Sequence, residues 1–225
     1  MLVGSRPETG LFLDQVGNLY GTTLRGGDGG CVGTNDETVG CGTVFELVPQ
    51  GGAWKESNLY SFQNSGDDGL YPSASPVVDG AGHIFCTTLR GGSGNSRCPS
   101  CGTAYEIMQN AGGVWSERRI FNFPGTDDQG TNPASNLIID AAGNLYGTTP
   151  GKVSGCNGFA CGTVFELTLG SGGAYTYDSL YSFTDIAPDG GSPEAGLIFG
   201  PSGSLLGTTE NGGNANEGAV FAVTP

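Results

Sequence analysis

The chain has few basic residues and no long apolar segment. Lys and Arg together supply 8 of its 225 residues against 22 Asp and Glu, giving a formal net charge of −14. Because nucleic acids and anionic membrane surfaces are bound through clustered Lys and Arg, we expect neither as a partner. No apolar run approaches the ~20 residues of a membrane-spanning helix, and residues 1–5 are too short for a signal peptide. A targeting segment for export would therefore lie outside this chain.

Segments with helical character are also missing. Runs rich in Ala, Leu, Glu and Lys with helical period do not occur, which disfavours helix throughout. Glycine supplies 43 residues, but without a G-X-Y period that would indicate collagen. Instead, β-branched and aromatic residues recur in short blocks, which predict strands, and the glycines predict the turns between them. The sequence therefore predicts an all-β protein.

A repeat of about 60 residues fills the chain; Cys41, Cys101 and Cys161, for example, lie 60 residues apart. The recurring segments are a proline-led strand A (7–14, 72–79, 133–140, 193–200), a strand B (17–23, 82–88, 143–149, 203–209), a strand C (41–47, 101–107, 161–167, 217–223) and an aromatic-rich strand D (54–62, 115–123, 175–183). We treat the chain as one repeat domain with units 7–71, 72–132, 133–192 and an incomplete 193–225, referred to below as units 1 to 4.

Turn chemistry connects the four strands of each unit into a meander. Asp-x-x-Gly-Asn, or its variant with His, predicts a tight A–B hairpin, and paired glycines predict a C–D hairpin. A four-stranded antiparallel meander is one blade of a β-propeller. Stacking of such blades is expected to bury one set of side chains: Leu19, Tyr20, Val44, Phe45, Tyr60, Phe62 and their counterparts.

The predicted fold is thus a β-propeller-like array of about four blades, the last of them incomplete. A β-solenoid is the alternative, although its coils usually have ~20–30 residues and no hairpins. A fragment of a larger propeller is the other alternative and the one we favour over a ring closed on a three-stranded blade. Unit 4 lacks strand D, and neither end of the chain supplies the strand that normally completes the last blade.

The repeat cycle resembles a known family, the GloVer-type tandem repeats of bacterial surface or secreted proteins. The resemblance covers nearly the whole chain and is clearest at 136–149, 162–167 and 180–183, which read NLIIDAAGNLYGTT, GTVFEL and LYSF. It implies export and a repeat architecture, with anchors that vary among the family's members. It supplies no catalytic residues.

Six of the seven cysteines flank the long connections between strands B and C. The second cysteine of each pair keeps its place at the start of strand C, whereas the first moves with loop length, as loop-closing disulfides do. The predicted disulfides are Cys31–Cys41, Cys98–Cys101 and Cys156–Cys161, each contributing roughly 2–3 kcal/mol. They indicate an oxidising compartment and hence an extracellular or cell-surface location. The alternative for Cys98-Pro-Ser-Cys101, a redox or zinc motif, lacks a second ligand pair and a helix. Cys86 has no partner and is predicted to be a buried free thiol.

We expect no catalytic residues and no certain cofactor. His83, the single histidine, occupies the turn position of Asn18 and Asn144, which favours a role in the loop over general-base catalysis. A glutamate recurs at one position of strand C in three units (Glu46, Glu106, Glu166), which favours a structural or solvated role over a glycosidase pair.

The acidic, glycine-rich D–A loops are the candidate metal sites. Calcium prefers oxygen ligands, and these loops offer Asp67, Asp68, Asp127, Asp128, Asp185 and Asp189. The alternative is that these aspartates are ordinary solvated turn residues, since they lack the spacing of an EF-hand.

The function predicted from these features is a binding or scaffold module outside the cell. Its ligand would be a glycan or a protein recognised by the variable B–C loops, and the chain would be monomeric or part of a longer array. The alternative is a secreted carbohydrate-active enzyme, a glycoside hydrolase or lyase that uses Asp and Glu carboxylates on the propeller frame.

Overall fold

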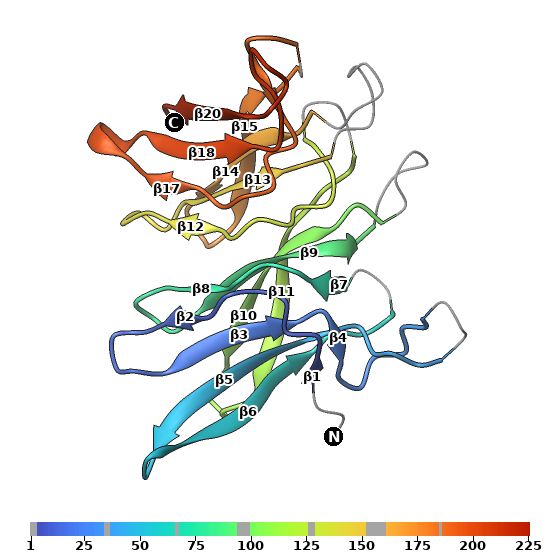
Figure 1. Ribbon diagram of the computed structural model, residues 1–225. Helices are drawn as coiled ribbons and strands as arrows, with labels where there is room; N and C mark the ends of the chain where they lie inside the picture. The colour runs from blue at the N-terminus through green and yellow to red at the C-terminus, as the bar shows by residue number, and fades with distance from the viewer. Residues whose placement is uncertain are drawn as a thin grey trace.

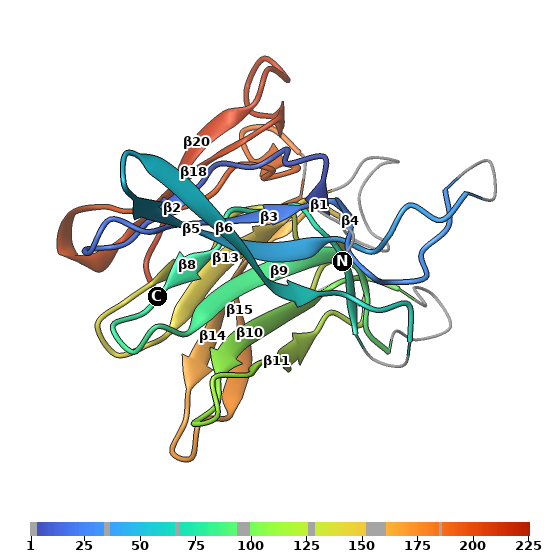
Figure 2. The same ribbon diagram turned by 90° about the horizontal axis from the view of Figure 1, so that it is seen from below.

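The computed structural model describes residues 4–33, 37–65, 68–93, 100–125, 129–151, 161–184 and 186–225. These residues form β-strands, turns and one short 3-10 turn, η1 (Pro201–Gly203). Within the described residues, no helix is long and apolar enough to cross a membrane. The sheets follow one another in chain order from the N-terminal to the C-terminal end (Figures 1 and 2).

Each of the first three units forms a four-stranded antiparallel meander, as predicted. Unit 1 consists of β2 (Phe12–Leu13), β3 (Leu19–Thr23), β5 (Thr43–Gln50) and β6 (Ala53–Ser61). Unit 2 consists of β8 (Val77–Val78), β9 (Ile84–Gly91), β10 (Thr103–Gln109) and β11 (Trp115–Asn122). Unit 3 consists of β12 (Ile138–Ile139), β13 (Leu145–Thr149), β14 (Thr163–Leu169) and β15 (Tyr175–Ser182). Unit 4 has three strands, β17 (Ile198–Phe199), β18 (Leu205–Thr209) and β20 (Ala219–Val223).

One further pairing, which joins the chain just before each unit to that unit, was not predicted. The chain just before each proline runs back along the end of strand B and pairs with it or with the residues that follow it. These pairs are β1 (Gly4–Ser5) with β4 (Arg25–Gly26), β7 (Gly69–Pro72) with β9, the bridge between Thr131 and Gly151, and β16 (Gly190–Gly191) with β19 (Asn211–Gly212). Glycine is needed there, since a Cβ on Gly69 would lie 2.6 Å from the Thr88 methyl carbon.

An aspartate side chain fixes each A–B hairpin in the first three units. Asp79 Oδ1 accepts hydrogen bonds of 2.9 Å from the backbone amides of Ala81 and His83. Asp14 and Asp140 make the same two bonds in units 1 and 3. Gly82 follows with a φ of 85°, a conformation open to glycine at little cost. This geometry explains the Asp-x-x-Gly motif physically.

Consecutive units join along a seam that uses the same three contacts each time. At the junction of units 1 and 2, the amide of Tyr71, the last residue of unit 1, donates to the Cys41 carbonyl at 2.9 Å and so positions Pro72 of unit 2. The Thr22 hydroxyl of unit 1 donates to the Ala74 carbonyl of unit 2 at 2.9 Å. The Phe62 ring packs edge-on against the Tyr105 ring, with centroids 4.9 Å apart. The matching pairs at the later seams are Asn132–Cys101, Thr87–Ser135 and Phe123–Phe165, then Ser192–Cys161, Thr148–Ala195 and Phe183–Phe221.

The predicted core is confirmed for some of its members and wrong for others. Val44 and Phe62 are fully buried and Tyr20 nearly so, whereas Leu19 and Phe45 are only half-buried. The reason is their position: both lie on the face of the unit 1 sheet that no other unit covers in the structure. Their counterparts inside the stack, such as Leu145 and Phe165, are fully buried. Tyr60 is also half-buried, and its hydroxyl donates to Asp68 in the D–A loop at 3.1 Å.

Candidate functional site

A tyrosine hydroxyl joins two carboxylates in units 1 and 3. The Tyr146 hydroxyl lies 3.1 Å from Asp140 Oδ2 in the A–B turn and 3.1 Å from Glu166 Oε1 on β14. Tyr20 bridges Asp14 and Glu46 in the same way, and burial raises its pKa to about 12. Tyr20 is therefore neutral at ordinary pH, and its hydroxyl donates a hydrogen bond to a carboxylate. This Asp–Tyr–Glu bridge ties strand C to the A–B turn.

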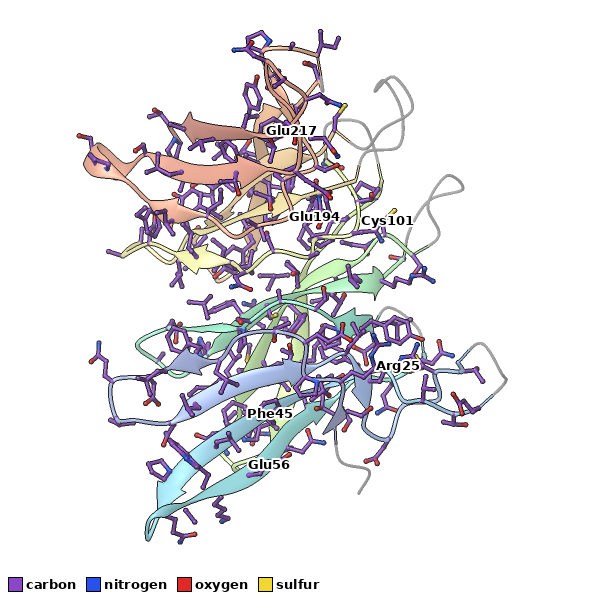
Figure 3. The ribbon with its side chains drawn as sticks, in the orientation of Figure 1. Arg25, Phe45, Glu56, Cys101, Glu194 and Glu217 are labelled. Carbon is purple, nitrogen blue, oxygen red and sulfur yellow. A yellow bond between two sulfur atoms is a disulfide. The ribbon has the colours of Figure 1, made fainter. Side chains whose placement is uncertain are left out.

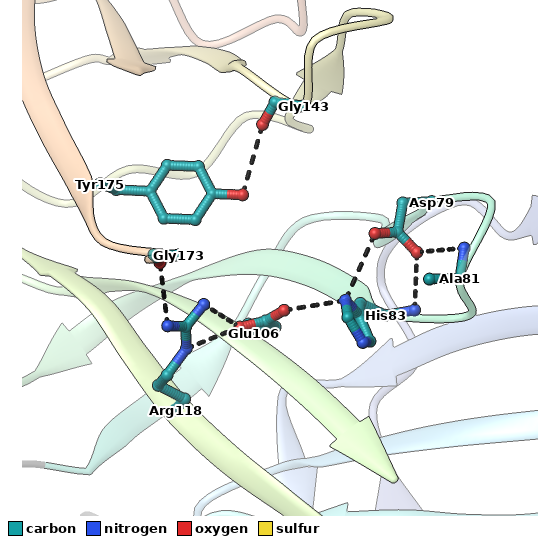
Figure 4. A network of polar contacts seen from close by, with 8 residues as sticks. All are labelled: Asp79, Ala81, His83, Glu106, Arg118, Gly143, Gly173 and Tyr175. Carbon is teal, nitrogen blue, oxygen red and sulfur yellow. Dashed lines mark hydrogen bonds and ion pairs between the residues drawn. The ribbon is translucent and has the colours of Figure 1, made fainter. Parts of the chain in front are cut away.

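Unit 2 replaces the tyrosine by Phe85 and makes the bridge with His83 instead. His83 Nδ1 lies 3.1 Å from Glu106 Oε1 and 3.4 Å from Asp79 Oδ2 (Figure 4). His83, predicted to be a loop residue, thus also connects Asp79 and Glu106, as the tyrosine hydroxyl does in units 1 and 3. Unit 4 has Gly200, Leu206 and Ala222 at the three bridge positions, so it has no such link.

Arg118 extends the unit 2 network across the seam into unit 3. Its Nε donates to Glu106 Oε2 at 2.7 Å, and its Nη1 donates to the Gly173 carbonyl at 2.9 Å. Glu106 is only 3% exposed, so both of its carboxylate oxygens are held by cationic or potentially cationic groups inside the protein. Charge-assisted bonds of this kind are stronger than neutral ones, and they fix the position of Arg118.

A cleft of about 570 Å³ opens beside this network, between units 2 and 3. Its polar lining includes Asp79, His83, Arg118, Asp140 and Tyr175, and its apolar lining includes Val78, Phe85, Ile139 and Leu169. The Tyr175 hydroxyl donates to the Gly143 carbonyl at 3.3 Å (Figure 4). Burial, aided by the charge of Glu106, raises the pKa of Tyr175 to about 12. The volume falls within the usual range for small-molecule sites.

The carboxylate of Asp140 stays ionised at the rim of this cleft. Burial alone would raise its pKa, but hydrogen bonds from the Asn144 amide, the Tyr146 hydroxyl and the Ala142 amide outweigh burial and lower the pKa. The cleft therefore combines anionic acceptors, an arginine donor, an aromatic ring and an apolar floor. Such a set suits a polar ligand with many hydroxyl groups.

The disulfide predicted between Cys31 and Cys41 is present, with Cα atoms 5.1 Å apart. The pairings Cys98–Cys101 and Cys156–Cys161 each include a residue outside the described ranges and stay predictions. Cys86 is a buried free thiol that donates to the Ala74 carbonyl at 3.1 Å. Burial raises its pKa to about 11, so the reactive thiolate is scarce at neutral pH.

Of the aspartates predicted to bind calcium, Asp68 and Asp189 are described, and both organise their own loop. Asp68 Oδ2 accepts from the Tyr60 hydroxyl and the Gln63 amide, and Asp189 accepts from Tyr181 and Thr184 in the same arrangement. Asp67, Asp127, Asp128 and Asp185 lie outside the described residues, so calcium binding by these loops stays a prediction. Across the residues the structure describes, no three His, Cys, Asp or Glu side chains gather as a metal site.

Glu117 on β11 supplies a pH-dependent element of stability. Burial, aided by the charge of Asp68, raises the pKa of Glu117 from 4.5 to about 7. The folded chain then holds a proton that the unfolded chain has released between these two values, so stability falls as pH rises from about 4.5 to 7. We expect a fall of about 1–2 kcal/mol, allowing for partial solvent screening, and expect Glu117→Gln to abolish it.

Urea unfolding between pH 4.5 and pH 8 measures this effect. Glu56→Gln is the matched control. Glu56 on β6 pairs with Leu47 on β5 as Glu117 on β11 pairs with Ile107 on β10, but Glu56 is exposed. The control should keep the wild-type pH dependence. An unchanged pH profile in Glu117→Gln would assign the dependence to another group.

The sequence contains a signal for this site that the residue-by-residue prediction did not use. The bridge positions change together within the chain: Tyr with Asn in units 1 and 3, Phe with His in unit 2, and Leu with Ser in unit 4, where Asp and Glu are lost too. Comparing units by position would have singled out Asp79, His83 and Glu106. Arg118 and Tyr175 leave no such signal, since they meet the network only across the seam.

The meanders and their seams define the chain as a β-propeller-type repeat module. It belongs to the Gloeobacter/Verrucomicrobia repeat family, whose family model matches residues 28–225, and this confirms the resemblance noted above. No curated protein sequence matches it significantly.

This chain is similar to several solved structures. A luciferin-regenerating enzyme aligns with a TM-score of 0.55 at 15% identity, over 96% of this chain and 60% of that protein. An exo-1,5-α-L-arabinanase from a bovine ruminal metagenomic library aligns with a TM-score of 0.43 at 8% identity, over 95% of this chain and 71% of the arabinanase. The chain thus spans about three fifths of the first of these proteins, and at this identity the likeness concerns the fold alone.

Proposed function

We propose that this chain is a non-catalytic binding module that acts outside the cell and takes a glycan segment into the cleft between units 2 and 3. The observation that carries the proposal is the composition of that cleft. Tyr175 offers an aromatic surface, Asp79 and Asp140 offer acceptors for hydroxyl groups, and Arg118 offers a donor. Ligand sites commonly combine an apolar floor with a few fixed polar groups in this way.

The engagement of Glu106 supports binding without turnover. A glycosidase needs one carboxyl group free to protonate the leaving oxygen and a second one free to attack or to activate water. Both oxygens of Glu106 are instead occupied by His83 and Arg118. Asp79 and Asp140 each hold a hairpin through two backbone amides. Asp79 and Asp140 are thus fixed in place and can still accept from ligand hydroxyl groups, but none of the three carboxyl groups is free to act as the acid or nucleophile of a glycosidase.

The location proposed follows from the disulfide and the charge. The Cys31–Cys41 bond would persist in an oxidising compartment, and the net charge of −14 keeps the chain away from anionic surfaces. The cleft lies at the A–B and C–D turns, the opposite end of the strands from the B–C loops to which the sequence assigned recognition. Much of those loops lies outside the described residues, and their role stays a prediction.

Binding to a panel of soluble plant and bacterial oligosaccharides, measured by calorimetry, tests the proposal. At least one should bind, and Tyr175→Leu should weaken that binding tenfold or more by removing the aromatic surface. Trp54→Leu is the matched control. Trp54 on β6 pairs with Pro49 in unit 1 as Tyr175 on β15 pairs with Leu169 in unit 3, and Trp54 does not line the cleft.

The same mixtures, analysed by chromatography after long incubation, test the absence of catalysis. Intact oligosaccharides are expected. If the oligosaccharides are cleaved and Asp140→Asn abolishes the cleavage, the protein is a carbohydrate-active enzyme and the proposal of a non-catalytic binding module is wrong. If Tyr175→Leu leaves the binding affinity unchanged, the cleft is not the binding site.

A further inference from the structure

Unit 4 exposes the face that every earlier unit buries against its successor. Val220 on β20 is 83% exposed, whereas the residues at the same position in units 1 to 3, Val44, Ala104 and Val164, are 0% exposed. Ile198 and Thr208 are exposed on this same face. The counterparts of Thr208, such as Thr22, are buried and donate to the next unit. We call this surface of unit 4 the trailing face.

Unit 1 exposes the opposite face, which every later unit buries against its predecessor. Leu11 is 50% exposed, whereas Leu137 and Leu197 at the same position are 3% exposed. Pro7 is exposed, whereas Pro72, Pro133 and Pro193 are buried. Phe45 is half-buried, although Tyr105 and Phe165 are fully buried against the aromatic ring of the preceding unit. We call this surface of unit 1 the leading face.

The backbone of the leading face is already set in the conformation that the seam requires. The seam donors Tyr71, Asn132 and Ser192 have φ values of 60°, 54° and 51°, and Arg6 at the same position has 59°. A positive φ is unfavourable for a residue with a side chain, so the turn is held in place by its surroundings. The Leu24 amide, for instance, donates to the Arg6 carbonyl at 3.0 Å.

The trailing face offers the matching half. At each internal seam the proline of the next unit packs against the glycine that opens strand C; a Cβ on Gly42 would lie 2.5 Å from a ring carbon of Pro72. Gly218 occupies that position in unit 4 and has a φ of 88°, close to the 82° of Gly162. The Glu217 carbonyl stands where Cys41, Cys101 and Cys161 accept the seam hydrogen bond. Figure 3 shows Phe45 and Glu217 at opposite ends of the stack.

We propose that copies of this chain associate head to tail, with the leading face of one copy packed on the trailing face of another. The contact would repeat the seam that the chain makes three times within itself: Pro7 on Gly218, the Arg6 amide on the Glu217 carbonyl, and Leu11 and Phe45 against the Val220 side of the sheet. Because the two faces differ, the interface is heterologous and produces a closed ring or an extending row of copies.

Sedimentation velocity across a dilution series tests this self-association. The wild-type chain should sediment as larger species at high concentration, and Val220→Arg and Leu11→Arg should each sediment as monomers. Both side chains lie on the surface, so the variants are expected to keep the wild-type melting temperature. Val114→Arg, an exposed valine in the C–D turn of unit 2, is the matched control and should associate as the wild type does.

A mixture of the two variants distinguishes a specific interface from non-specific association. The Val220→Arg chain keeps its leading face, and the Leu11→Arg chain keeps its trailing face, so equal amounts should form a one-to-one heterodimer that neither forms alone. A wild-type chain that remains monomeric at its highest soluble concentration overturns the proposal. So does a mixture that remains monomeric, or a loss of association in Val114→Arg.

Discussion

Phe165→Ala is expected to lower the free energy of unfolding by about 3–5 kcal/mol, the range for deleting a fully buried aromatic ring. Phe165 is fully buried on β14, and its ring packs against Phe123 of unit 2 with centroids 5.3 Å apart. It also stacks on Tyr177 at 5.8 Å, so its loss opens a cavity at the seam between units 2 and 3. Urea unfolding followed by tryptophan fluorescence and by circular dichroism measures the change.

Phe45→Ala removes the same ring at the same place in unit 1 and should cost less than half as much. Phe45 is half-buried because no other unit packs on its side of the unit 1 sheet in the structure. The difference between the two variants isolates the contribution of stacking between units from that of packing within a unit. Equal costs would show that the units are stabilised from within and that the seams add little.

Glu106→Ala is expected to lower the free energy of unfolding by about 2–3 kcal/mol. The change removes a buried carboxylate and leaves Arg118 and His83 without their shared partner. Breaking a buried pair typically costs 3–5 kcal/mol, but Arg118 and His83 are about 40% exposed and regain water, which reduces the cost. Glu106→Ala should also abolish oligosaccharide binding, because Arg118 loses its anchor at the cleft.

Glu166→Ala is the comparison for Glu106→Ala. It removes the glutamate from the tyrosine-centred bridge of unit 3, where one neutral hydroxyl is left and no arginine is involved, so a loss of about 1 kcal/mol is expected. Glycan binding should be retained. If the two glutamate variants lose equal stability, the arginine and histidine contribute no more than the tyrosine does.

Much of the fold could be predicted because the same turn and strand motifs recur in successive units. Asp-x-x-Gly recurs because one carboxylate must hold two amides in the A–B turn, and the paired glycines recur at the C–D turn. The short pairings next to each proline were missed because a segment of one to four residues carries no period. The half-buried state of Leu19 and Phe45 was missed because it depends on which neighbours a unit has, a property that no single segment contains.

The candidate site could be predicted only in part from the sequence. The recurring glutamate and the single histidine both stand out in the sequence, but the sequence does not show that they lie together. What joins them is the pleat of neighbouring strands, which sets His83 beside Glu106 through the pairing of β9 with β10. The cleft itself forms between two units, so Arg118 and Tyr175 meet there only after the sheets have stacked.

The seam has a consequence for how arrays of this kind change length. One contact joins main-chain groups and another sets a proline against a glycine. The threonine hydroxyl bonds to a main-chain carbonyl, and the aromatic contact occurs with either Phe or Tyr. A unit can therefore pack on any other unit of the repeat and does not require a particular one. Duplication or deletion of a whole 60-residue block in the gene would leave every remaining joint intact, so array length can drift while each unit is free to diversify its loops.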